Sequence, residues 1–292
     1  MERIGLVVHP RRAIGRALDA VADWARAHGV EVVQVRTPGQ DREVAPAGEA
    51  ADCDLVVALG GDGTTLAALR AAALVQRPVL GVACGSLGAL TATSAEALPE
   101  TLDRVRAGDW HERRLPALEV HARAAHRALN DLVIVRDGAG QVSVSIWVDD
   151  QLYVRFGGDG VVVATPLGSS AYTLAAGGPI LAPGTDAIVI TPLAPHGGCC
   201  PPLVTNADAA VRVLVEAGWG GARIELDGQI DAVVEPQDPV ELTARLLPGD
   251  ATLVALGGEE AMLAGLRRRK ILMDSPRMLA RDNRNPVERE RV

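Results

Sequence analysis

Aromatic residues are scarce in this chain of 292 residues: they make up 2% of it, and there is a single Phe. Acidic residues outnumber basic ones, and the formal net charge is −8. A nucleic-acid-binding surface needs positive charge and aromatic rings on which bases stack, so this composition argues against DNA or RNA as a partner. Small anionic ligands are still compatible with it, because local backbone dipoles can hold a phosphate against an unfavourable net charge.

Cysteines and long apolar runs are also sparse. The four cysteines show no Cys-x-x-Cys spacing, and the vicinal pair Cys199-Cys200 lacks the further His or Cys that a zinc site requires. No basic-then-apolar leader precedes the run Ile4–Val8, and no apolar stretch is long enough to cross a bilayer. We therefore expect a cytoplasmic protein with reduced thiols, no membrane partner and no metal ligands among its own side chains.

The sequence is rich in short runs of Val and Leu between turn signals. In the first half these strand-like runs alternate with segments of helical spacing, which predicts a parallel sheet of the Rossmann or flavodoxin type with helices on its faces. Ligands bind such sheets beyond the carboxyl ends of the strands. We assign this α/β domain to residues 1–115. The strand-like runs are residues 4–8, 30–35, 55–59 and 79–82, and the helical segments are residues 14–28 and 65–74.

The pattern changes in residues 116–258 to short alternating or β-branched runs without long helical periodicity. Such runs between turn signals predict an antiparallel, all-β second domain. Helical spacing returns at Glu259–Arg269, and the charged segment 281–292 is expected to be a mobile tail, since it has little apolar surface to bury. The turn signals include Asp149-Asp150, Asp227-Gly228 and Pro248-Gly249-Asp250.

The stretch Gly60-Gly61-Asp62-Gly63-Thr64 directly follows a strand that the pattern predicts to be buried. Its glycines let the backbone approach a ligand closely, and the N–H groups at the start of the next helix can cradle phosphate oxygens. A carboxylate beside bound phosphates is unfavourable unless it has a task, such as general base toward an attacking hydroxyl. The alternative is an Asx turn that joins a strand to a helix. The stretch is neither a Walker loop nor a dinucleotide fingerprint.

Two further stretches indicate a flat, hydroxylated ligand. Residues 157–172 hold a glycine-flanked strand with Asp159, followed by a turn of small residues that leads to Tyr172. Tyr172 is one of only two tyrosines, so it is a candidate for stacking or for a hydroxyl contact, with an ordinary core tyrosine as the alternative. Asn130-Asp131 supplies an adjacent amide and carboxylate that can grip ribose hydroxyls or the edge of a purine, unless it is a plain turn.

Together, in this order and spacing, these stretches resemble the NAD kinase family. The resemblance runs from the first strand to about Arg269, which is nearly the whole chain. The long signature that ends at Tyr172 is highly specific, whereas Gly-Gly-Asp-Gly is shared with lipid kinases and, loosely, with phosphofructokinases. The matching elements are Gly60–Thr64, Pro78–Gly88, Leu129–Asp131, Asp159–Tyr172, Ala176–Pro179, Pro195-His196 and Asp227–Gln229.

The resemblance implies a donor-binding α/β domain, an NAD-binding β domain, and a C-terminal segment, about residues 260–280, that returns to the first domain. It implies Mg²⁺-dependent transfer of the terminal phosphoryl group of ATP or polyphosphate to the 2′-hydroxyl of the adenosine ribose of NAD, giving NADP. It also implies a homodimer or a homotetramer. In such reactions the protein contributes positioning and charge neutralisation rather than covalent chemistry.

The resemblance also implies roles for the matched residues. Asp62 would orient or deprotonate the ribose hydroxyl. The donor pyrophosphate, with Mg²⁺, is expected at Gly60, Gly61, Gly63 and Thr64. NAD is expected at Asp62, Gly63, Asn130, Asp131, Asp159, Ser170, Ala171 and Tyr172, with Asp159 toward the nicotinamide end.

Several positions depart from the family pattern and leave the substrate preference open. Leu167 and Ser170 each stand in place of a Thr, and Asp131 stands in place of a Glu. Gly157, where some members restricted to NAD⁺ carry an Arg, hints that NADH is also accepted. The other departures are at Ala83, Cys84, Ala89 and Gly197–Cys200.

Two alternative functions stay open at this point. One is a kinase of the same superfamily that acts on another nucleoside, lipid or sugar hydroxyl, and the signature at 159–172 argues against a lipid. The other is a non-catalytic nucleotide-binding sensor, which predicts loss of the loop carboxylate, whereas Asp62 is present. The scattered histidines, His9 among them, lack ligand spacing and are predicted to be structural or solvated.

Overall fold

The computed structural model of this chain describes residues 1–39, 42–122, 125–182, 184–236, 238–257, 265–267 and 270–284. The chain forms two compact units, Met1–Leu256 and Gly257–Val292. None of the helices in the described ranges is both long and apolar enough to cross a membrane.

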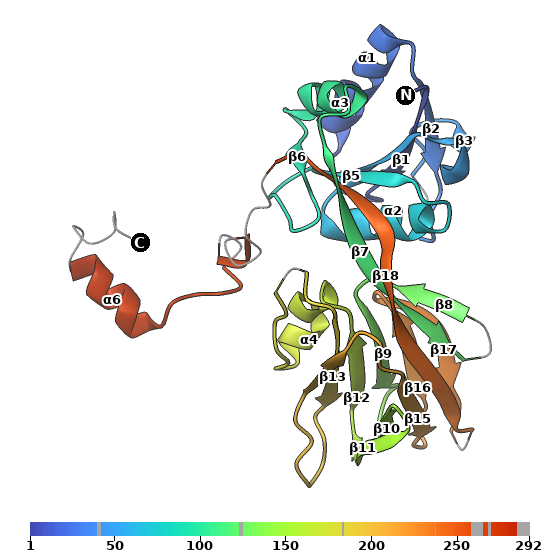
Figure 1. The fold of residues 1–292 in the computed structure, drawn as a ribbon, viewed down its shortest axis with the longest axis vertical. Coiled ribbons are helices and arrows are strands. Elements are labelled where there is room, and N and C mark those ends of the chain that lie inside the picture. The colour runs from blue at the N-terminus through green and yellow to red at the C-terminus, as the bar shows by residue number, and fades with distance from the viewer. Residues whose placement is uncertain are drawn as a thin grey trace. The chain divides into compact units, whose positions relative to one another are not determined.

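The N-terminal part of the first unit is an open α/β sheet, as the sequence predicts (Figure 1). Its strands lie in the order β5-β4-β1-β2-β3, and all of these neighbours are parallel. Alternate side chains of the strands belong to two separate apolar clusters, one with α2 and one with α1 and α3, so helices cover both faces. The elements are β1 (Arg3–Val8), α1 (Gly15–His28), β2 (Glu31–Val35), β3 (Ala47–Gly48), a 3₁₀ turn (Ala50–Asp52), β4 (Leu55–Gly60), α2 (Asp62–Ala73), β5 (Pro78–Ala83), β6 (Thr93–Ser94) and α3 (Leu98–Arg106).

The rest of the first unit is mainly antiparallel β structure, which confirms the predicted all-β fold class of this part of the chain. A six-stranded sheet has the order β14-β13-β12-β9-β16-β17. It packs against a second layer, and apolar side chains from both layers form one core. The elements are β7 (His111–His121), β8 (Ala125–Ala128), β9 (Asp131–Arg136), β10 (Val142–Val148), β11 (Gln151–Gly158), β12 (Gly160–Ala164), a 3₁₀ turn (Gly168–Ser170), α4 (Tyr172–Ala175), β13 (Ala187–Leu193), β14 (Leu203–Asn206), β15 (Val211–Ala217), β16 (Ala222–Leu226), β17 (Gln229–Val234) and β18 (Val240–Ala255).

One long strand, β18, belongs to both domains (Figure 1). Its first residues pair antiparallel with β15, and its end pairs in parallel with β5 through Thr252 and Leu253. The strand β7 runs antiparallel beside it over both stretches. The expected boundary near residue 115 therefore falls inside β7, and a continuous sheet connects the α/β domain to the β domain.

The prediction of a turn at Pro248-Gly249-Asp250 is wrong. These residues form a bulge within β18, where the register against β7 shifts between Leu247 and Ala251. Proline is tolerated there because a bulged residue need not donate to the ladder, and Gly249 takes a positive φ of 61°. Pairing with β7 on both sides of the bulge keeps the strand continuous where the local sequence alone indicates a reversal.

The second unit is described only in part. Most of the predicted helix Glu259–Arg269 lies outside the described residues, and 265–267 are helical. Arg267 forms a bidentate ion pair with Asp274, at 3.0 and 2.8 Å. The helix α6 (Pro276–Arg284) includes the first residues of the expected tail, and 285–292 lie outside the described residues. The mobility of the tail and the return of this segment to the first domain stay predictions.

Candidate active site

The glycine loop forms the junction between β4, which ends at Gly60, and α2. The helix begins at Asp62 rather than at the predicted residue 65. Gly61 is extended and acts as the N-cap, and its carbonyl oxygen accepts the N–H groups of Thr64 and Thr65 at 3.0 Å each. Asp62 therefore lies in the first turn, where the helix dipole stabilises a negative charge. Local propensity misses this start because glycine and aspartate are weak helix formers.

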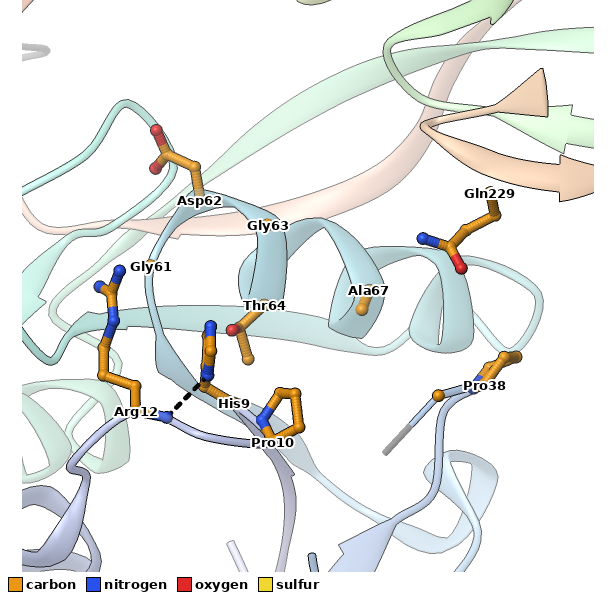
Figure 2. A pocket seen from close by; sticks show the side chains of 11 residues that line it. His9, Pro10, Arg12, Pro38, Gly61, Asp62, Gly63, Thr64, Ala67 and Gln229 are labelled. Atoms are coloured by element: carbon orange, nitrogen blue, oxygen red, sulfur yellow. Dashed lines mark hydrogen bonds between the residues drawn. The ribbon is translucent and has the colours of Figure 1, made fainter. Parts of the chain in front are cut away.

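The Asp62 carboxylate is held by a neighbouring loop. Its two oxygens accept the backbone N–H groups of Ala89 at 3.0 Å and Leu90 at 2.9 Å. Figure 2 shows the carboxylate directed toward this loop and away from Thr64. A Cβ atom on Gly88 would lie 2.0 Å from Oδ1 of Asp62, so the carboxylate occupies space that only a glycine at position 88 leaves open.

A pocket of about 350 Å³ lies at the start of α2 (Figure 2). The α/β domain supplies most of its lining, and Gln229 at the start of β17 comes from the β domain. The pocket is therefore formed by both domains of the first unit. Its lining residues are His9, Pro10, Arg12, Pro38, Gly39, Gly61, Asp62, Gly63, Thr64, Ala67 and Gln229.

The predicted NAD-binding pair Asn130-Asp131 lies at the turn between β8 and β9. The carboxylate of Asp227 accepts three N–H groups of this turn: Leu129 at 3.0 Å, Asn130 at 2.6 Å and Asp131 at 3.3 Å. The Asp227 side chain is fully buried, and the Arg70 guanidinium of α2 lies 3.8 Å from it. A buried carboxylate in the turn between β16 and β17 thus fixes the backbone of the Asn130 turn.

Asp131 has an unusual protonation equilibrium. Burial, together with the nearby carboxylates of Asp227 and Glu225, raises its pKa to about 7. Burial also raises the pKa of Asp227, against the opposing effect of the N–H groups that it accepts and of Arg70. Near neutral pH a substantial fraction of Asp131 is protonated, so this side chain can donate as well as accept a hydrogen bond.

The turn after β12 packs directly on Asn130. Thr165 donates its N–H to the Asn130 carbonyl at 2.9 Å and its hydroxyl to the Leu129 carbonyl at 2.6 Å. A Cβ on Gly168 would lie 2.0 Å from the Asn130 carbonyl oxygen, so glycine is required for this approach. Leu167, where the family pattern has Thr, packs against the apolar cluster of α2, so an apolar contact stands in place of a hydroxyl.

The remaining predicted NAD-binding residues lie near this turn or at the far end of β12. The Ser170 hydroxyl donates to the Leu167 carbonyl at 3.3 Å, Ala171 is exposed, and 40% of Tyr172 is exposed. Asp159, between β11 and β12, accepts from Nε of Arg136 at 2.6 Å. None of the predicted NAD-binding residues of the β domain is among the described residues that line the 350 Å³ pocket.

The structure adds residues that the sequence argument did not assign to the site. His9 and Arg12 line the pocket, although His9 has no ligand spacing in the sequence. Asp227 and Gln229 match the family pattern only as parts of a turn, yet Asp227 holds the Asn130 turn and Gln229 reaches the pocket. The match of Asp227–Gln229 to the family pattern was the available signal for these two; no comparable signal marks Arg12.

A glycine-rich loop with a carboxylate at a helix start, in an α/β domain continued by an antiparallel β domain, defines a phosphotransferase of the kinase class. Family models agree: residues 4–110 match the ATP-NAD kinase N-terminal domain, and residues 129–245 match the ATP-NAD kinase C-terminal domain. The chain belongs to the NAD kinase family.

Curated relatives agree with this assignment, and solved structures share the fold. The chain is 34% identical over 259 residues to the NAD kinase of Syntrophotalea carbinolica, covering 83% of this chain and 90% of the relative. It is 39% identical over 227 residues to the NAD kinase of Symbiobacterium thermophilum, covering 72% and 80%. Its fold matches yeast NADH kinase complexed with NADH, with a TM-score of 0.79, 22% identity, and coverage of 94% of this chain and 89% of that one. It also matches an NAD kinase from Archaeoglobus fulgidus in complex with ATP, with a TM-score of 0.72, 23% identity, and coverage of 93% and 100%.

Proposed function

We propose that this chain transfers the terminal phosphoryl group of ATP to the 2′-hydroxyl of the adenosine ribose of NAD, giving NADP. The observation that carries the proposal is the position of Asp62: a fixed carboxylate at the first turn of α2, in a pocket that both domains line. A kinase for a ribose hydroxyl needs a carboxylate beside the phosphates and a second domain that presents the acceptor. Family membership selects NAD from the nucleoside and sugar substrates that the sequence left open.

Asp62 is proposed to orient the 2′-hydroxyl and to accept its proton. The two carboxylate oxygens accept the backbone N–H groups of Ala89 and Leu90. The two hydrogen bonds hold the side chain in one rotamer before the substrate binds. The carboxylate therefore loses little further freedom on reaching the reactive geometry, which favours catalysis.

The donor phosphates are proposed to bind at Gly60, Gly61, Gly63 and Thr64. The first N–H groups of a helix have no acceptor within the helix, and they and the helix dipole attract a phosphate. Mg²⁺ is proposed to arrive as the Mg–ATP complex, since kinase sites hold this ion largely through phosphates and waters.

The acceptor is proposed to bind at the Asn130 turn and along residues 159–172. Asn130 and Asp131 would hold the adenosine portion, because Asp227 and Thr165 already fix their backbone. The pocket of Ser170, Ala171 and Tyr172 is proposed to surround it. Asp159 is proposed at the nicotinamide end. These assignments follow the family signature and the packing of the 165–168 turn on Asn130.

Three finer properties belong to the same proposal. The chain is proposed to form a homodimer or a homotetramer; the edge strand β17 supports this, since 63% of Ile230 and 55% of Val233 are exposed on it. A cytoplasmic location is supported by four cysteines that are all free. Polyphosphate is proposed as a second donor. Light scattering of the purified protein checks the first of these, and a donor substitution in the assay below checks the last.

The test is a coupled assay. Purified protein is incubated with Mg–ATP and NAD, and NADP is measured with an NADP-specific dehydrogenase. NADH in place of NAD tests the acceptor, and polyphosphate in place of ATP tests the donor. NADP formation above background is expected with ATP and NAD. Its absence, together with turnover of another nucleoside or a sugar, would assign the chain to a different hydroxyl substrate.

A further inference from the structure

Among the described residues that line the 350 Å³ pocket, Arg12 carries the one permanent positive charge. Its Nη1 atom lies 3.4 Å from the Gly60 carbonyl oxygen. A Cβ atom on Gly61 would lie 3.2 Å from the same nitrogen, and a Cβ on Gly85 would lie 3.3 Å from it. The guanidinium therefore rests against the bare backbone of the glycine loop.

Among the residues that the structure describes, none forms an ion pair that neutralises the charge of Arg12. Within the described ranges no carboxylate oxygen lies within 4.0 Å of its guanidinium nitrogens. The net charge of the whole chain is −8. The charge of Arg12 at the glycine loop is therefore opposite in sign to the net charge of the chain. A planar guanidinium also matches the oxygens of a phosphate with two parallel N–H bonds.

The backbone of Arg12 is fixed from two sides. Nδ1 of His9 accepts the N–H groups of Arg11 at 3.1 Å and of Arg12 at 2.9 Å. The Arg12 carbonyl accepts from Nη1 of Arg42 at 2.8 Å. In the view of Figure 2 the His9 ring lies between Arg12 and Thr64. The dashed line marks the hydrogen bond from the Arg12 N–H to the ring. The loop after β1 thus holds Arg12 at the pocket.

His9 is suited to this task because its ring is neutral. A nitrogen that accepts two N–H groups carries no proton, so the ring hydrogen is on Nε2. Burial and the charges of Arg12 and Arg42 lower the pKa of His9, which favours the same neutral form. The contact to residues two and three positions ahead is the one that an Asx side chain makes in a turn.

We propose that Arg12 binds the phosphates of the phosphoryl donor, and that His9 is the positioning residue that sets the loop carrying it. The proposal deepens the proposed function and rests on it for the identity of the donor. Arg12 and the N-terminus of α2 would contact the same anion from two elements. The acceptor NAD also carries a diphosphate, so the test separates the two sources.

The test compares Arg12→Gln and Arg12→Lys with Arg11→Gln, a neighbouring exposed cation that does not line the pocket. The KM values for ATP and NAD are measured, and the binding of ADP and of inorganic tripolyphosphate is measured by calorimetry without NAD. Arg12→Gln should raise the KM for ATP and weaken tripolyphosphate binding by about tenfold to a hundredfold, the effect of losing a charge-assisted hydrogen bond. Arg12→Lys should give a smaller loss, and Arg11→Gln should match the wild type within about twofold.

Three results would overturn the assignment of Arg12. They are wild-type tripolyphosphate affinity in Arg12→Gln, an equal loss in Arg11→Gln, and a rise in the KM for NAD in place of the KM for ATP. The binding measured by calorimetry does not depend on whether the protein makes NADP. If the wild-type protein binds tripolyphosphate but makes no NADP, the proposed function fails while the phosphate contact of Arg12 is still decided.

The positioning role of His9 has its own pair of variants. His9→Ala should raise the KM for ATP without raising the KM for NAD, with an unchanged melting temperature. His9→Asn should restore the wild-type value, because the Asn side-chain oxygen accepts N–H groups two and three residues ahead. Wild-type behaviour of His9→Ala, or a His9→Asn variant as weak as His9→Ala, would contradict the role.

Discussion

The Arg70 guanidinium of α2 lies 3.8 Å from the buried Asp227 carboxylate, the group that holds the Asn130 turn. The same helix carries Asp62 in its first turn. A single helix therefore links the proposed base at its start to the proposed NAD-binding turn two turns later. Because α2 is a rigid element between them, the relative position of the two groups is built into the fold before either substrate binds.

Substitution of Asp227 tests this link at the proposed NAD-binding turn. Asp227→Asn keeps one acceptor oxygen and replaces the other by an amide NH₂, so at least one of the three N–H groups of the turn loses its partner. An unsatisfied buried donor lowers the free energy of unfolding by about 1–3 kcal/mol, and the looser turn should raise the KM for NAD more than the KM for ATP. Urea unfolding and steady-state kinetics check both effects.

Arg70→Gln is the matched variant for the other side of the contact. Its ion pair is long and 35% of the Arg70 side chain is exposed, so the loss of unfolding free energy should stay below about 1 kcal/mol. The KM for NAD should move in the same direction as in Asp227→Asn, but less. A larger destabilisation by Arg70→Gln than by Asp227→Asn would contradict the assignment of Asp227 as the group that holds the turn.

The fold was largely predictable from the sequence because its signals are local. The buried strand β4 follows an unbroken apolar run, and the alternation in Val142–Val148 indicates a strand with one buried face. The prediction of a turn at Pro248-Gly249-Asp250 is wrong because β7, which pairs with the chain on both sides of these residues, lies far away in sequence and keeps the chain extended. The start of α2 was missed because Asp62 is stabilised there by the helix dipole and by tertiary contacts, not by its own propensity.

The site was less predictable, since its defining contacts join distant segments. The motif marks Asp62, yet nothing local shows that Ala89 and Leu90 hold its carboxylate. The requirement for glycine at position 88 is likewise a matter of packing against another element. Arg12 is one arginine among many until the fold brings it to the glycine loop.

Asp62→Asn should lower kcat by about a hundredfold to ten-thousandfold, the range for a positioned general base. The Asn side chain keeps an oxygen that can accept one of the loop N–H groups, but it has no basic oxygen for the hydroxyl proton. The KM for NAD should change little. Asp19→Asn, at an exposed position of α1, is the control and should retain full turnover. Near-normal kcat in Asp62→Asn would reject the base assignment.

Gly88→Ala tests the space that the Asp62 carboxylate occupies. The new Cβ would lie 2.0 Å from Oδ1, so the carboxylate or the loop must move. A shift of about 1 Å in a catalytic group lowers the rate on the order of a hundredfold, and overpacking lowers the free energy of unfolding by about 1–3 kcal/mol. Gly15→Ala, where no atom lies within 4 Å of the added Cβ, is the control. Unchanged kcat in Gly88→Ala would show that the held rotamer of Asp62 is not required for turnover.

The stability of the chain should depend on pH through Asp131. Its pKa is about 7 in the folded chain, mainly because of burial, against an ordinary value of 3.8. Between these values the folded chain holds a proton that the unfolded chain has released, so the free energy of unfolding falls as pH rises, by at most about 1.4 kcal/mol per pH unit. The contribution is complete below the ordinary value and is lost as pH rises through about 7.

Asp131→Asn carries no such proton. The free energy of unfolding of the wild type minus that of the variant, measured by urea unfolding, should therefore decrease from about pH 5 to about pH 8. The pKa of Asp227 is also raised by burial, but this residue is present in both proteins and its effect largely cancels in the difference. Parallel stability curves for the two proteins would show that Asp131 titrates in the folded chain as it does in water.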